Sequence, residues 1–415
     1  MRLSGRHRIG RTTSASLAAV LTAAVALTVG ASSAQADEAF YTPPSPLPAG
    51  QNGDVIKSQA SKLDNAKATR IMYLTRDSKD KQIPVTGTVA VPNTPWAGPG
   101  PRPIVAYPVF TAGLGDQCAP SKTIAGEGGG DVAGAFQVMF INALLQKGFA
   151  VAQTDYEGLG TPGDHTYVMR RAEAHATLDV IRAAQRLPES GLSKDSPVGI
   201  AGYSQGGGAS AAAAELAPEY APELNLKGAY AGAPPADLGV LAKSLDGAYA
   251  VGFLGYALVG INAAYPETKI ATDLANEEGK KVFEEARKTC TMGAILQFPF
   301  KQTKTLTKDG RPVSDYLGEE PFKSVVADQK IGNLKPTAPV QVEHSPVDDI
   351  VPYGQGKQMA KDWCGKGANV EFKDLISFSP VFSHAIAAPI ASGNAANWLA
   401  DRFAGKPATS NCGKF

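Results

Sequence analysis

The sequence of 415 residues carries almost no net charge and contains few of the residues that bind metals. Its 40 lysines and arginines face 39 acidic residues, and 43% of the chain is apolar, which excludes a disordered, fibrous or strongly basic nucleic-acid-binding protein. It has four cysteines without a C-x-x-C pair and five histidines, and no His, Cys, Asp or Glu cluster has metal-ligand spacing. We therefore expect no metal, no other cofactor and no nucleic-acid partner.

Residues 1–36 have the pattern of a secretory signal peptide. Four arginines precede an apolar stretch at 17–29, and Ala34-Gln35-Ala36 fits a small-x-small cleavage site. The alternative, a transmembrane anchor, needs a run of roughly 20 apolar residues, which this stretch does not reach. We expect a secreted, extracellular protein without a transmembrane anchor, whose mature chain has 36 basic and 39 acidic residues once the four arginines are removed.

Export predicts that the four cysteines have a structural role, as disulfides. Disulfides persist in oxidising compartments, so we expect two of them. The four cysteines allow three pairings, and spacing alone does not choose among them. They are Cys118, Cys290, Cys364 and Cys412.

Short apolar segments alternate with helical patterns along most of the chain. An antiparallel pair is predicted at 69–76 and 84–91, joined by a charged turn. Further strands are predicted at 104–110, 149–154, 198–203, 228–233, 340–343 and 370–375. Helices are predicted at 170–186, 207–216 and 388–403, the last with Pro389 in its first turn. Strands that alternate with helices indicate an α/β fold with a mostly parallel sheet of about eight strands.

One interval of about a hundred residues breaks this alternation, far more than a typical loop. We interpret residues 235–337 as an inserted, mainly helical cap between two parts of a core at 37–234 and 338–415. The cap has an uncharged run at 247–266 and a helical pattern at 273–289. The uncharged run is only modestly hydrophobic, so a helix buried between cap and core is favoured over a membrane span.

The candidate nucleophile is Ser204, in Gly202-Tyr203-Ser204-Gln205-Gly206. This G-x-S-x-G pattern arises easily by chance in a chain with 44 glycines. Here an apolar strand leads directly into the serine and a helix follows, which is the setting of a nucleophile elbow. The alternative is an ordinary glycine-rich corner. A second glycine pattern, at 158–163, fits G-x-G-x-x-G, but no helix starts directly after it, so we interpret it as a structural loop.

The base should follow the nucleophile in the sequence, because the hydrolase order is serine, acid, histidine. His165 and His175 precede Ser204, His7 lies in the signal segment, and His344 stands before the acid cluster. His384 remains, on the predicted loop between the last strand and the last helix; the alternative is a surface histidine.

The acid is expected on a loop after a strand, where Asp348 and Asp349 stand side by side. Either could orient the histidine, and the residues alone do not choose between them. The oxyanion donors are expected at the backbone N–H of Gln205 and in the loop 109–116, where we single out Thr111 and Gly113. A plain glycine-rich turn is the alternative for that loop.

The sequence resembles the secretory lipase family of the α/β-hydrolase superfamily over nearly all of its mature length. The resemblance rests on the elbow at Ser204 together with FYTPPSPLPAG at 40–50, GDQCAPS at 115–121, DYEG at 155–158, VDDIVP at 347–352 and WLADRFAG at 398–405. It implies an α/β-hydrolase fold, the inserted cap, Ser204 as nucleophile, Asp348 as acid and His384 as base. It also implies disulfides between Cys118 and Cys290 and between Cys364 and Cys412. The loop 110–113 departs from the family's commoner form.

These patterns predict a secreted serine carboxylester hydrolase, a lipase or esterase that cleaves acyl esters through an acyl-enzyme intermediate. The substrate would be a small-molecule or lipid ester, and transient contact with lipid interfaces is compatible with it. Two alternatives stay open. One is an acyltransferase or peptidase that uses the same three residues, and the other is a catalytically silent fold that serves as a binding module.

Overall fold

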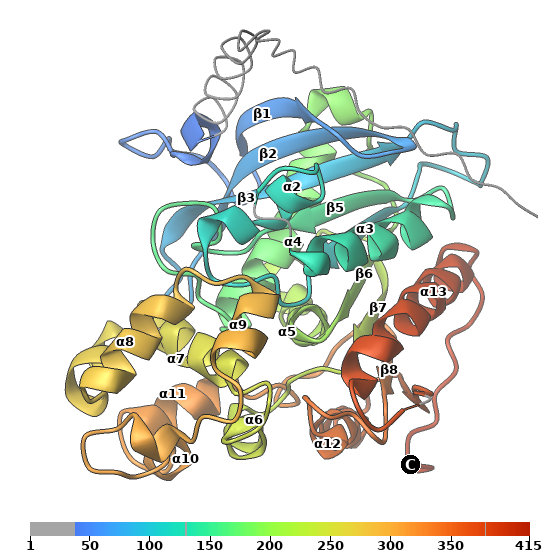
Figure 1. Cartoon of the computed structure of the whole chain (residues 1–415). Coiled ribbons are helices and arrows are strands. Elements are labelled where there is room, and N and C mark those ends of the chain that lie inside the picture. Colours follow the sequence, from blue (N-terminus) through green and yellow to red (C-terminus); the bar gives the residue numbers. More distant parts are fainter. Residues whose placement is uncertain (1–37, 129–130, 378) are drawn as a thin grey trace, which may run out of the picture. The chain divides into compact units, whose positions relative to one another are not determined.

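A sheet of nine strands, in the order β1-β2-β3-β5-β4-β6-β7-β8-β9, organises the computed structural model (Figure 1). The strands are β1 (Val55–Ser61), β2 (Ala66–Arg76), β3 (Gln82–Pro92), β4 (Ile104–Pro108), β5 (Ala150–Thr154), β6 (Val198–Tyr203), β7 (Leu226–Gly232), β8 (Val340–His344) and β9 (Val370–Asp374). Pairing is antiparallel from β1 to β3 and between β3 and β5, and parallel from β5 onward. The structure describes residues 38–128, 131–377 and 379–415, of which 41–415 form one compact unit. The predicted signal segment 1–36 lies outside the described residues.

Buried apolar strands explain why the sheet is covered on both faces. Every residue of β4, β5 and β6 is buried, so neither face of these strands can meet water. The helices α3 (Val132–Leu145) and α13 (Ser383–Phe403) pack on one face, and α4 (Arg170–Arg186), α5 (Gln205–Tyr220) and α12 (Tyr353–Gly365) on the other (Figure 1). The fold class predicted from the sequence, an α/β-hydrolase fold, is confirmed.

The structure corrects the predicted number of strands and the predicted start of the last helix. The ninth strand is β1, an edge strand in which no residue is buried and which gives no continuous apolar signal, and it carries a register irregularity between Val55 and Lys57. The last helix begins at Ser383 rather than at 388, so Pro389 lies inside α13 and His384 lies in its first turn instead of on a loop. Proline is a frequent first-turn residue but does not by itself mark where a helix starts.

Residues between β7 and β8, which we call the insertion, form six α-helices and most of a second apolar core, to which Tyr167, Met169 and Ile350 also belong. The helices are α6 (Leu238–Leu245), α7 (Gly252–Ala264), α8 (Glu277–Ala286), α9 (Thr291–Gln297), α10 (Val313–Tyr316) and α11 (Phe322–Gln329). The predicted helix at 273–289 is instead a π-helical turn at Ile270–Leu274 followed by α8. The run at 247–266 contains α7, which packs against α8 and α9 inside this core. Among the described residues no helix combines the length and apolarity needed to cross a bilayer.

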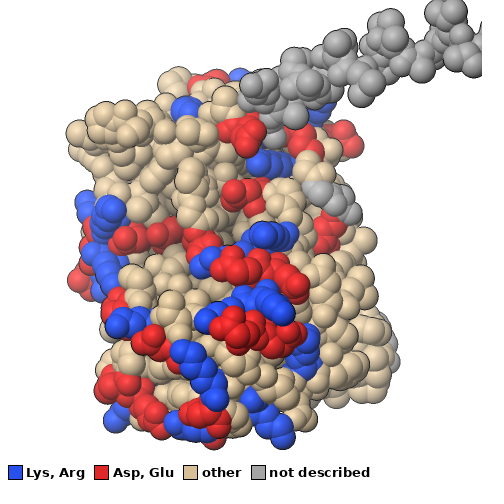
Figure 2. Space-filling view, turned by 60° about the vertical axis from the view of Figure 1, so that its left-hand side comes forward, with Lys and Arg blue, Asp and Glu red and all other residues tan. Residues whose placement is uncertain are grey.

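Charges on the face shown in Figure 2 are intermingled rather than gathered by sign. The insertion contains local ion pairs, as of Lys280 with Glu277, Arg287 with Glu284 and Arg311 with Glu319. Exposed pairs of this kind contribute little to stability. This face therefore presents no broad field of one sign to an approaching molecule.

Candidate active site

The turn from β6 into α5 places Ser204 at the carboxyl end of a central strand. Ser204 is the residue directly before α5 and has φ 57° and ψ −125°, a strained conformation for a residue with a side chain. Its backbone N–H donates to the carbonyl of Gly232 at 2.9 Å, which ties the turn to β7. The N-terminal N–H groups of α5 follow immediately and favour negative charge beside the serine.

Glycines are required around this turn because backbone approaches it closely. A Cβ on Gly202 would lie 2.2 Å from the carbonyl oxygen of Gly206, and a Cβ on Gly206 would lie 2.1 Å from the carbonyl oxygen of Pro108. Neither contact is sterically allowed. The G-x-S-x-G pattern is therefore a packing requirement of the strand, turn and helix.

His384 lies beside Ser204 and is bound on its other side by Asp348. The distance from His384 Nε2 to Ser204 Oγ is 2.8 Å, and the distance from His384 Nδ1 to Asp348 Oδ2 is also 2.8 Å. The ring packs on Tyr203, whose hydroxyl donates to the carbonyl of His384 at 2.7 Å. Residues separated by up to 180 positions thus form one hydrogen-bonded chain.

Asp348 is buried but held in its ionised form. Burial alone would raise its pKa, yet the charge of His384 and the hydrogen bonds from His344 and His384 outweigh burial, so the pKa lies below its ordinary value. Its Oδ1 accepts from the backbone N–H groups of Ile350 at 3.0 Å and Val351 at 2.8 Å. A carboxylate so fixed can hold one tautomer of His384.

The neighbouring Asp349 does not touch the His384 ring. Its carboxylate accepts from the backbone N–H of Phe382 at 2.7 Å and of His384 at 3.0 Å, and from the hydroxyl of Tyr249 at 3.0 Å. The two aspartates that the sequence left equivalent therefore have different surroundings.

Gln205 directs its side chain into the core, away from Ser204. Its Nε2 donates to Glu173 Oε1 at 2.7 Å and lies 3.2 Å from His165 Nε2. Burial lowers the pKa of His165 to about 4, so the ring is neutral; its Nδ1 lies 2.8 Å from the carbonyl oxygen of Glu157, to which it donates. What Gln205 presents to the site is consequently its backbone N–H.

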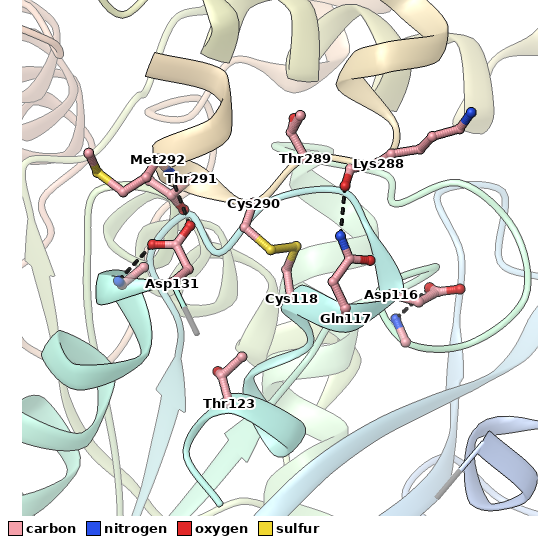
Figure 3. Close-up of a disulfide and its surroundings, with 12 residues drawn as sticks. Asp116, Gln117, Cys118, Thr123, Asp131, Lys288, Thr289, Cys290, Thr291 and Met292 are labelled. Carbon is pink, nitrogen blue, oxygen red and sulfur yellow. Dashed lines mark hydrogen bonds between the residues drawn. A yellow bond between two sulfur atoms is a disulfide. The ribbon is translucent and has the colours of Figure 1, made fainter. Parts of the chain in front are cut away.

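A disulfide just after the loop 110–115 joins this part of the core to residues 288–292 of the insertion (Figure 3). Cys118 is bonded to Cys290, and Gly113 forms an isolated antiparallel bridge with Cys290. Cys364 is bonded to Cys412, between the end of α12 and the C-terminal segment. The structure thus contains both pairs that the family resemblance implied.

Hydrogen bonds extend this joint along the loop. Thr291 donates from its hydroxyl to the carbonyl of Thr111 at 2.7 Å and from its N–H to the carbonyl of Ala112 at 3.1 Å. Leu114 donates its N–H to the carbonyl of Thr289 at 3.0 Å. The Thr111 hydroxyl lies 2.6 Å from that of Tyr167. Residues of the insertion therefore fix the peptide planes of the loop in which oxyanion donors are expected.

Asp131 connects the same part of the insertion to α3 (Figure 3). One carboxylate oxygen accepts from the N–H of Ala133 at 2.9 Å, in the first turn of α3, and the other accepts from the N–H of Met292 at 3.0 Å, in the first turn of α9. One side chain caps a core helix and an insertion helix together.

A cavity of about 140 Å³ opens onto Ser204 and His384. Thr111 also lines it, whereas Gly113 is not among its lining residues. Its walls are mainly apolar and come from core and insertion together: Phe110, Phe136, Phe253, Met292, Ile295, Ile350 and Ala388. A smaller cavity of about 70 Å³ lies within the insertion and contains neither Ser204 nor His384.

Within residues 38–128, 131–377 and 379–415, no group of three or more His, Cys, Asp or Glu side chains is arranged to hold a metal ion. The glycine pattern at 158–163 lies on the loop between β5 and α4, and α4 begins only at Arg170.

Sequence reasoning brought Ser204, His384 and Asp348 together but missed the residues that hold them. Nothing in the sequence indicated that Asp349 contacts α13 or that Glu173 contacts Gln205. The role of Thr291 could have been inferred from the implied Cys118–Cys290 bond, because that bond places residue 291 beside the loop 110–115.

Known proteins resemble this chain in sequence over most of its length. The model of the family described as "Secretory lipase" matches residues 131–411. A protein of Mycobacterium tuberculosis named as a probable inactive lipase is 30% identical over 90% of this chain and 84% of its own length. A secreted triacylglycerol lipase of Malassezia globosa is 29% identical over 91% of this chain and 83% of its own length.

Solved structures give the same result. Candida antarctica lipase A in its closed state aligns with a TM-score of 0.79 at 27% identity, covering 90% of this chain and 87% of that one. With the family model matching more than half of the sequence and the fold shared over nearly the whole of lipase A, this chain belongs to the secretory lipase family.

Proposed function

We propose that the chain is a secreted serine carboxylester hydrolase, a lipase or esterase, in which Ser204 is the nucleophile, His384 the base and Asp348 the acid that orients the base. The observation that carries the proposal is the hydrogen-bonded chain from Asp348 through His384 to Ser204. Relatives named as secreted triacylglycerol lipases support both the ester substrate and export.

In this mechanism Ser204 Oγ attacks the ester carbonyl carbon while His384 Nε2 takes its proton. The C–O bond to the leaving group then breaks, and His384 returns the proton to the departing alkoxide, which leaves as an alcohol. Water attacks the acyl carbonyl carbon while His384 Nε2 takes one of its protons; the bond from that carbon to Ser204 Oγ then breaks, His384 returns the proton to Oγ, and the carboxylic acid leaves. Asp348 stabilises the imidazolium formed in both halves.

Negative charge on the carbonyl oxygen needs donors beside Ser204. The backbone N–H of Gln205 stands at the start of α5, and the second donor is assigned to Thr111 in the loop 110–113. The apolar cavity walls would receive the acyl chain, with residues 235–337 acting as the cap that shelters it.

Ser204→Ala tests the assignment against nitrophenyl esters of short to long acyl chains. We expect turnover to fall by about 10⁶-fold, the loss typical of a missing nucleophile. Ser210→Ala is the matched control, because Ser210 is buried in α5, the helix that follows Ser204, and its hydroxyl has no partner among the described residues. Retained turnover in Ser204→Ala would reject the proposal.

A catalytically silent protein is the second candidate, favoured by the relative named as a probable inactive lipase. A fluorophosphonate probe separates the two, because it labels only an activated serine. Labelling of the wild type that is absent from Ser204→Ala supports the hydrolase, and an unlabelled wild type supports the silent candidate.

A further inference from the structure

The carboxylate of Asp349 is surrounded by donors from the start of α13. Oδ2 accepts from the N–H of Phe382 at 2.7 Å, and Oδ1 accepts from the N–H of His384 at 3.0 Å. The hydroxyl of Ser383 lies 3.0 Å from Oδ1 and accepts from the N–H of Asp349 at 3.1 Å. A side chain from the loop after β8 therefore satisfies N–H groups that a helix start leaves without partners.

The position needs a cap from elsewhere in the chain. Phe382 directly precedes α13, has φ 56° in the left-handed region, and has no polar side chain with which to cap the helix. A carboxylate at a helix N-terminus is favoured by the helix dipole and makes charge-assisted hydrogen bonds. Asp349 supplies both effects at the turn that carries His384.

Asp348 and Asp349 consequently hold different parts of one histidine. Asp348 binds the ring at Nδ1, and Asp349 binds the backbone N–H of the same residue. We propose that Asp349 is a positioning residue, which fixes the start of α13 so that His384 Nε2 stays within reach of Ser204 Oγ. This inference rests on the proposed function, since it assumes that His384 is the base.

Tyr249 of the insertion also contacts Asp349 and the start of α13. Its hydroxyl donates to Asp349 Oδ2 at 3.0 Å, and its ring meets that of Phe382 edge-on with centroids 5.6 Å apart. Burial, together with the nearby charge of Asp349, raises the pKa of Tyr249 above its ordinary value, so the hydroxyl remains a donor. The base is thus held from the core loop and from the insertion.

The negative charge of Asp349 gives a way to tell a positioning role at His384 from a role in stability alone. Among the described residues, the titratable groups bonded to His384 are Asp348 and Asp349 from the loop after β8 and Tyr203 from β6. Two more act through these aspartates: Tyr249 of the insertion bonds Asp349, and His344 lies 3.5 Å from Asp348 Oδ2. Both tyrosines have raised pKa values through burial and the aspartates. The two aspartates bring negative charge to His384, which favours the protonated imidazole.

Asp349→Asn removes the charge while keeping the shape. We expect kcat on a soluble nitrophenyl ester to fall by about 10- to 100-fold, the scale of a small misplacement of a reacting group, with KM largely unchanged. In the pH profile of kcat/KM, the acid limb, where activity falls as the base becomes protonated, should move to lower pH. The reason is that the imidazolium of His384 loses a neighbouring negative charge. Asp349→Glu restores the charge and should return the acid limb toward wild type while kcat stays reduced.

Asp237→Asn is the matched control. Asp237 also caps a helix with its carboxylate, as the N-cap residue of α6, through the N–H groups of Gly239 and Val240, but that helix carries no group of the proposed mechanism. It should lower the unfolding temperature without changing kcat or the acid limb.

The inference would be overturned if folded Asp349→Asn had the same kcat and the same acid limb as the wild type. A loss of activity that matches only the lost fraction of sites labelled by fluorophosphonate would also overturn it. If Asp349→Asn does not fold, an unchanged kcat in Asp349→Glu overturns it. The proposed function fails separately, through retained turnover in Ser204→Ala.

Discussion

The two sides of the candidate active site are held by different kinds of interaction. On the base side, the carboxylates of Asp348 and Asp349, both from one core loop, bind His384. On the oxyanion side, the loop 110–115 is held by neutral backbone and hydroxyl groups of the insertion and by the Cys118–Cys290 bond. Charge should therefore govern the base side, and the covalent joint with the insertion should govern the oxyanion side.

Asp348→Asn breaks the base side and should have the largest effect. The amide keeps the shape of the carboxylate but does not stabilise the imidazolium and favours the wrong tautomer of His384. We expect kcat to fall by about 10³–10⁴-fold while KM changes little. Steady-state kinetics on nitrophenyl esters measure this, and a loss of less than tenfold would contradict a charge-dependent base side.

Removing the disulfides one at a time compares the oxyanion side with a remote site. The bonds close 172 and 48 residues, so by loop-closure entropy they contribute at most about 5 and about 4 kcal/mol to stability. Replacing Cys118 and Cys290 by alanine should also lower kcat, by up to about 10²-fold, because the donor loop loses its support. Replacing Cys364 and Cys412 should lower stability alone.

Denaturant unfolding and kcat per fluorophosphonate-labelled site measure the two effects. If kcat per labelled site were equal in the two double variants, the Cys118–Cys290 bond would not support the loop 110–115.

Glu173→Gln changes the ionisable group that accepts from the side chain of Gln205 and should have the smallest effect. Burial raises the pKa of Glu173 to about 8, although hydrogen bonds from Gln205 and Val168 act in the opposite direction. The folded state then holds a proton that the unfolded state has lost. Wild-type stability should therefore fall as pH rises from about 4.5 to about 8, with the full penalty present above that range.

The variant keeps an acceptor for Val168 and Gln205 but does not titrate. Its unfolding temperature, followed between pH 7 and pH 8.5, should decline less than that of the wild type. Parallel curves for the two proteins would contradict the assigned role of the Glu173 proton.

The sequence predicted the parts of the fold that depend on local pattern. Buried strands such as β6 are continuous apolar runs, and the glycines around Ser204 reflect backbone contacts within a few residues. The edge strand β1, in which no residue is buried, has no such pattern. The start of α13 was misplaced because Asp349, more than thirty positions earlier, caps that helix. Contacts made across the fold leave no local signal, and most of the support around His384 and Thr111 is of this kind.

Gly113 sets a limit on how the substrate range of this protein can be altered. A Cβ there would lie 2.5 Å from Cys290 Cα and 2.6 Å from the carbonyl oxygen of Thr289, and φ is 131°, so no other residue fits without displacing the insertion. Directed evolution of acyl selectivity should leave this loop unmutated. Libraries are better placed at Phe136 and Ile295, which line the cavity from α3 and α9 and belong to neither side of the catalytic arrangement.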